Sequence, residues 1–153
     1  MARELHRNSQ MPRVATQRFG TLDYDQAHEI RFPNGLPGFE QQRRFLLVEQ
    51  PTFAPLVFLQ SLEAVGPCFI ALPIGVIDSH YELPLSEEDA ALLTPSGPSD
   101  LLSLAILTAP GDSPPTANLL APVVVNLAAR VGVQVVRADT KYSHCHPVGG
   151  PCS

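Results

Sequence analysis

The residues best suited to chemistry in this sequence gather near its C-terminus. His144, Cys145 and His146 follow one another, and Cys152 lies a few residues further on. Thiolate and imidazole groups are good zinc ligands, and a cysteine beside a histidine can act as a nucleophile. The spacing matches no structural zinc pattern, however, and the sequence places no third orienting group nearby. A strand end followed by a tail is the preferred interpretation, and a small β-barrel enzyme or metal-binding protein is the alternative.

A row of carboxylates is the second candidate for chemistry. Asp23, Asp25 and Glu29 could face one side of a strand, because side chains alternate between the faces of a strand. An active site built on paired carboxylates would usually bring a deep cleft and polar aromatic side chains, and this chain has three tyrosines and no tryptophan. We therefore predict no catalytic residue, no bound metal, no cofactor and no enzyme activity.

Charge is distributed unevenly along the 153 residues, whose net charge is −5. No lysine or arginine occurs between Arg44 and Arg130, whereas that span holds many acidic residues. Phosphate binding needs clustered cations, so nucleic acid is not expected as a direct partner. An acidic surface favours a basic protein partner, although acidic residues also keep a small protein soluble. The candidate partner-binding residues are Glu49, Glu63, Asp78, Glu87, Glu88 and Asp89.

Short apolar runs separated by prolines indicate the fold class. The sixteen prolines are about twice the ordinary usage, and their spacing favours many short strands and few long helices. One helix is predicted from Ser86, which is suited to the N-cap, with Asp89 in the capping-box position. We predict a mainly β single domain, a curled antiparallel sheet or barrel with one short helix. The predicted strands are 14–19, 22–30, 45–48, 56–62 (an edge strand, because Pro55 opens it), 68–72, 101–109, 123–127 and 133–136.

The ends of the chain differ in character from its middle. Residues 1–12 are polar and aperiodic and are expected to be a disordered leader, residues 13–148 the β domain, and residues 149–153 a flexible tail. No apolar run approaches the roughly 18 residues that a membrane span needs, and the N-terminus lacks the apolar stretch of a signal peptide. Three cysteines without framework spacing agree with a reducing compartment. We therefore expect a cytoplasmic protein with no membrane partner.

Two segments combine apolar residues with turn-forming residues. The segment from Phe32 to Phe39 is predicted to be a compact corner, with turns at Asn34, Gly35 and Gly38 and with both phenylalanine rings buried. In the segment 116–126, Pro122 cannot donate to a sheet ladder and should open the strand that follows it. Asn118 and Asn126 are expected to bond nearby backbone groups at turns.

Together these segments resemble the FliW family of flagellar assembly factors. The resemblance rests on four motifs in order and covers residues 14 to 148. Cys145 departs from the pattern, because FliW-like sequences usually have arginine there. The motifs are Phe32-Pro33-Asn34-Gly35-Leu36-Pro37-Gly38-Phe39, Phe58-Leu59-Gln60-Ser61-Leu62-Glu63, Asn118-Leu119-Leu120-Ala121-Pro122, and Tyr142-Ser143 followed by His146-Pro147.

The resemblance implies a function in partner exchange. It implies a cytoplasmic binding protein, not an enzyme, that acts as a chaperone of flagellin before export. It also implies that the same protein antagonises CsrA, a small basic RNA-binding dimer that regulates translation. Release of flagellin by secretion would free the factor to bind CsrA, so that flagellin mRNA is translated. The acidic span of this sequence has the sign that is needed to meet a basic regulator.

Overall fold

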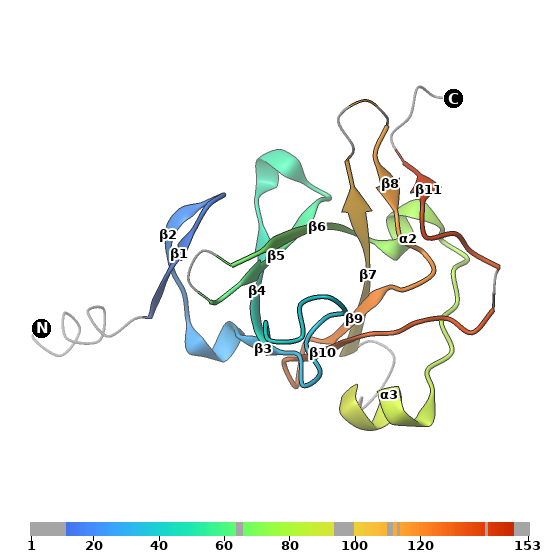
Figure 1. The fold of residues 1–153 in the computed structure, drawn as a ribbon, viewed down its shortest axis with the longest axis horizontal. Coiled ribbons are helices and arrows are strands. Elements are labelled where there is room, and N and C mark those ends of the chain that lie inside the picture. Colours follow the sequence, from blue (N-terminus) through green and yellow to red (C-terminus); the bar gives the residue numbers. More distant parts are fainter. Residues whose placement is uncertain are drawn as a thin grey trace, which may run out of the picture.

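Short strands close into a seven-stranded barrel (Figure 1). Neighbouring strands follow the order β3, β4, β5, β6, β7, β9, β10, and β10 returns to pair with β3. That last pair is parallel, whereas the other barrel pairs are antiparallel. The predicted β-barrel class is thereby confirmed. The barrel strands are β3 (Ile30–Arg31), β4 (Arg44–Glu49), β5 (Val57–Ser61), β6 (Cys68–Pro73), β7 (Leu101–Thr108), β9 (Val123–Asn126) and β10 (Val131–Gln134).

The remaining elements lie around this barrel in the computed structural model. A separate hairpin is formed by β1 (Arg13–Thr16) and β2 (Gly20–Asp23), and β8 (Thr116–Ala117) pairs with both β7 and β11 (His146–Pro147). The helices are α2 (Ile74–Ile77) and α3 (Glu87–Leu93), with 3-10 turns η1 (Gln26–His28) and η2 (Pro51–Phe53). The structure describes residues 12–63, 66–93, 100–109, 112, 114–139 and 141–148. All of the expected leader 1–12 except Pro12, and the whole tail 149–153, therefore lie outside the described residues.

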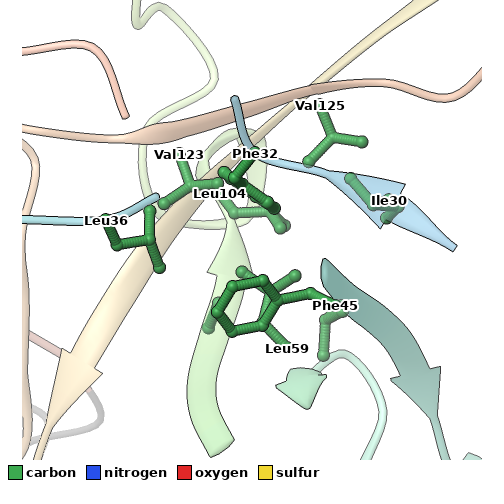
Figure 2. Packing of buried hydrophobic residues seen from close by; sticks show 10 residues of the cluster. Ile30, Phe32, Leu36, Phe45, Leu59, Leu104, Val123 and Val125 are labelled. Atoms are coloured by element: carbon green, nitrogen blue, oxygen red, sulfur yellow. The ribbon is translucent and has the colours of Figure 1, made fainter. Parts of the chain in front are cut away.

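The corner that follows β3 fills the interior of the barrel. Phe32 and Leu36 come from this corner and pack with side chains of the surrounding strands, as Figure 2 shows. The Phe32 ring meets the Phe45 ring edge to face, with centroids 5.2 Å apart. Burying a side chain of this size stabilises the fold by about 1.5–3 kcal/mol. The other fully buried members of this cluster include Ile30, Leu59, Leu104, Val123 and Val125.

Two glycines make room for this corner. A Cβ atom on Gly132 of β10 would lie 2.6 Å from Cζ of Phe32, so a larger residue there would collide with the ring. Gly35 has a φ of +64°, and a Cβ atom there would lie 2.5 Å from the backbone oxygen of Glu40. Glycine adopts this left-handed backbone conformation at no steric cost. The corner is therefore held by backbone geometry as well as by apolar burial.

Three further apolar clusters cover the outside of the barrel wall. The β1–β2 hairpin packs on β4 through Val14 and Leu46, and α3 packs on β9 and β10 through Leu93 and Val124. On the remaining side, α2 and the C-terminal segment pack against β7 around Ala105. Strands covered on both faces have continuous apolar sequences, which is why their positions were predictable from the sequence.

The predicted strand 22–30 is wrong. Asp25 accepts a hydrogen bond from the amide of Ala27 and caps η1. This 3-10 turn interrupts the extended backbone between β2 and β3. The carboxylate row is wrong for the same reason, because its members lie on different elements. Asp23 pairs with Arg13 at 2.9 Å, and Glu29 lies 3.5 Å from Arg44.

Two further expectations about the elements are corrected. β5 is not an edge strand, because it lies between β4 and β6 in the barrel. Pro55, whose presence suggests an edge in the sequence, precedes the strand and therefore removes no ladder hydrogen bond. The sequence predicts one helix, and the structure adds α2, a single turn directly after Pro73.

The two phenylalanines that frame the corner differ in burial. Phe32 is 0% exposed, as expected, whereas Phe39 is 42% exposed, so the expectation of burial is wrong for Phe39. The amide of Phe39 donates to the carbonyl of Leu36 at 2.7 Å, and this turn brings the chain back to the surface. The Phe39 ring lies edge to face on Phe69, which covers one side of it.

Candidate partner-binding surface

The start of α3 gathers three carboxylates in one helical turn. Ser86 Oγ accepts a hydrogen bond from the amide of Asp89 at 3.1 Å, which confirms the predicted N-cap. Glu87 and Glu88 are exposed and Asp89 is half-buried. Carboxylates are favoured at this end of a helix, where the helix dipole is positive. The helix thus presents negative charge to solvent while its last residue, Leu93, is fully buried.

An apolar groove lies beside these carboxylates. It has a volume of about 340 Å³ and lies between the chain at 84–89 and the extended segment 135–139 that follows β10. We call it the α3 groove. Leu85 and Val135 line it, together with Val136, whose exposed fraction of 65% is high for a large apolar side chain. Apolar surface beside charged residues is typical of a protein-binding site.

Arg137 anchors the strand side of the α3 groove. Its guanidinium carbon lies 5.0 Å from the centroid of the Tyr81 ring and 4.9 Å from that of Tyr142. The guanidinium also donates to the backbone oxygen of Glu82 at 2.6 Å and to the carboxylate of Asp139 at 2.9 Å. The hydrogen bond from Arg137 lowers the pKa of Asp139. These contacts join three chain segments and hold the groove wall in place.

The helix side of the groove is anchored by Asn126. Its Nδ2 donates to the backbone oxygen of Leu93 at 2.7 Å, and its Oδ1 accepts from the amides of Ala128 and Ala129. Asn118 similarly accepts from two amides in the turn after β8. Both asparagines satisfy backbone groups as predicted, and β9 begins directly after Pro122.

The other predicted partner-binding residues lie apart from α3. Glu49 is at the end of β4, and Glu63 follows β5 with its carboxylate 3.9 Å from Arg44. Because β4 and β5 are antiparallel, Glu49 and Glu63 lie at opposite ends of that strand pair. Asp78 ends α2 and accepts a hydrogen bond from the amide of His80. Of the six carboxylates, the structure brings only the three of α3 together.

The sequence did not predict the apolar part of the groove. It places Val136 in a strand and Leu85 beside the expected helix, with no binding role for either. In the structure β10 ends at Gln134, and Val136 is exposed whereas the adjacent Val135 is buried. Two neighbouring valines give no sequence signal that separates them. The two sides of the groove could not be paired from the sequence, since they lie far apart in the chain.

The C-terminal histidines and cysteine do not form a metal site in the described part of the chain. No group of three or more His, Cys, Asp or Glu side chains there is placed to hold a metal ion. Cys145 is exposed, and its amide donates to Ser143 Oγ. His146 begins β11, which pairs with β8, and Cys152 lies outside the described residues.

None of the helices described could cross a membrane.

These features define a small closed β-barrel protein whose candidate site is a surface groove. The FliW protein family model matches residues 13–148. The chain is 33% identical over 138 residues to the flagellar assembly factor FliW of Bacillus subtilis, covering 90% of this chain and 96% of that protein. It is 30% identical over 140 residues to that of Syntrophomonas wolfei, covering 91% and 90%.

A solved structure agrees with these matches. The crystal structure of a flagellar assembly factor FliW superposes with a TM-score of 0.82 at 30% identity, covering 89% of this chain and 96% of that one. The chain belongs to the FliW family of flagellar assembly factors.

Proposed function

We propose that this chain binds flagellin and the translational regulator CsrA as alternative partners in the cytoplasm. While flagellin is retained in the cell, it occupies the chain. Export of flagellin frees the chain, which then antagonises CsrA and permits translation of flagellin mRNA. The observation that carries the proposal is the family match over residues 13–148, nearly the whole chain.

The charge of the α3 groove supports the regulator as one of the two partners. CsrA is a basic protein, and Glu87 and Glu88 present exposed carboxylates in the helical turn whose Asp89 lines the apolar groove. Complementary charge accelerates encounter, and the apolar groove would supply the short-range contact. Partner exchange requires binding surfaces and no bond-making chemistry, which is consistent with a non-enzymatic role.

Mixing purified components tests the proposal. We expect the chain to co-elute with CsrA and, separately, with flagellin in size-exclusion chromatography at micromolar concentrations. Adding flagellin to the complex with CsrA should release CsrA. If neither partner shifts the elution of the chain, the proposed function is wrong. If both partners bind together in one ternary complex, binding would stand and partner exchange would be wrong.

A further inference from the structure

The segment that follows β10 has one hydrogen-bonded edge and one open edge. The amide of Val135 donates to the carbonyl of Pro122 at 2.8 Å, and the amide of Arg137 donates to the carbonyl of Leu120 at 2.9 Å. Successive amides of an extended strand point in opposite directions. The amides of Gln134 and Val136 therefore point away from that ladder, and the Val136 amide donates to no backbone group in the described part of the chain.

The edge is open because β3 is short. β3 pairs with β10 only at Val131 and Arg31. Directly afterwards the chain turns into the corner, where the amide of Gly35 donates to the carbonyl of Phe32. The corner enters the barrel instead of continuing beside β10. The neighbouring strand thus ends before it reaches the outward amides of the segment that follows β10.

This open edge lacks the usual protection against pairing. Exposed edges are commonly guarded by lysine, other charged side chains or proline, and no lysine or proline occurs in residues 134–138. The one charged side chain there, Arg137, is held against the rings of Tyr81 and Tyr142. The same contacts keep the segment extended beyond Val136. A strand that is already ordered loses little conformational entropy when another strand pairs with it.

We propose that this edge binds an extended segment of a basic partner as an added β-strand. Backbone hydrogen bonds to Gln134 and Val136 would supply affinity, as in other cases of strand addition. The occupant is a segment that carries lysine or arginine beside small apolar side chains. Charge complementarity argues for the cations, since Asp89 lines the α3 groove and Glu87 and Glu88 are exposed in the same helical turn. The inference rests on the proposed function, with CsrA as the basic partner.

The variant Val136→Pro tests strand addition. Proline removes the outward amide but no hydrogen bond to the β9 side, so it is tolerated in an edge strand. We expect binding of purified CsrA to weaken roughly tenfold or more, because a partner carbonyl loses its donor. The matched control Val136→Ala keeps the amide but also removes the valine side chain from the groove, so the loss of CsrA binding that Val136→Pro shows beyond Val136→Ala measures the missing donor. Both variants are compared by isothermal titration calorimetry after thermal unfolding is checked.

Hydrogen exchange on the unaltered chain tests the same point without a mutation. On binding CsrA, the amides of Gln134 and Val136 should exchange more slowly. If the unaltered chain binds CsrA without such protection, or a folded Val136→Pro variant binds as tightly, strand addition is wrong and the proposed function stands. If the unaltered chain does not bind CsrA at all, the proposed function fails and this inference fails with it.

Discussion

The corner inside the barrel and the α3 groove on its surface place apolar side chains in opposite environments. Phe32 is 0% exposed and its ring contacts that of Phe45, whereas Val136 is 65% exposed. The corner gains its stability from contacts within the chain. Folding buries little of the Val136 side chain and so gains little stability from it, yet Val136 lies on an ordered segment beside carboxylates. The difference indicates that the corner determines the fold and that the groove is available for a partner.

The largest effect on stability is expected from removing the Phe32 ring inside the barrel. Phe32→Ala should lower the free energy of unfolding by about 3–5 kcal/mol, because a fully buried ring leaves a cavity. Phe39→Ala is the matched control from the same corner, and its cost should be clearly smaller because that ring is 42% exposed. Urea unfolding measures both. Equal losses of unfolding free energy for the two variants would contradict the conclusion that Phe32 is buried and Phe39 is partly exposed.

A smaller effect is expected from crowding the same ring. Gly132→Ala would place a Cβ atom 2.6 Å from Phe32 Cζ, and overpacking of this kind costs about 1–3 kcal/mol. Gly75→Ala is the control, because a Cβ atom there would meet nothing within 4 Å. Thermal unfolding should show a lower midpoint for Gly132→Ala only. A Gly132→Ala variant as stable as the unaltered chain would show that the corner can shift.

The sequence predicted the interior better than the surface, for physical reasons. Apolar runs such as 45–48 and 101–109 are largely enclosed, so their composition alone located β4 and β7. The strand prediction fails at Asp25 because a local cap competes with strand formation. The α3 groove joins residues 84–89 to residues 135–139. Closure of the barrel creates that proximity, and no local pattern encodes it.

The anchor of the groove wall should respond to pH. The pKa of Asp139 is lowered in the folded chain by its hydrogen bond from Arg137. A carboxyl with a lowered pKa stabilises the fold above its unfolded pKa of about 3.9, and this contribution is lost as the pH falls through the folded pKa. Asp139→Asn should therefore be slightly less stable than the unaltered chain near neutral pH.

Urea unfolding across a pH series checks this expectation. The difference between Asp139→Asn and the unaltered chain should shrink as the pH falls below about 4. The effect is the smallest of the three on stability, because the Asp139 side chain is half exposed to solvent. A difference that stays constant down to acid pH would show that the ion pair does not anchor the wall.

The most direct test of the central claim is the rate at which CsrA associates with a charge-reversed groove. Changing Glu87, Glu88 and Asp89 to lysine should slow association strongly at low salt and affect dissociation less. The control variant changes Glu49, Glu63 and the exposed Asp112 to lysine, which alters net charge equally but at residues that do not line the α3 groove. Each lysine at the helix start costs about 0.3–1 kcal/mol of stability, so folding is verified first.

Stopped-flow measurements over a range of salt concentrations would compare the three proteins. We expect the α3 variant to associate much more slowly than the control variant, and its rate to depend less on salt than that of the unaltered chain. A folded α3 variant with an unchanged association rate and unchanged salt dependence would contradict the claim that CsrA binds at the α3 groove.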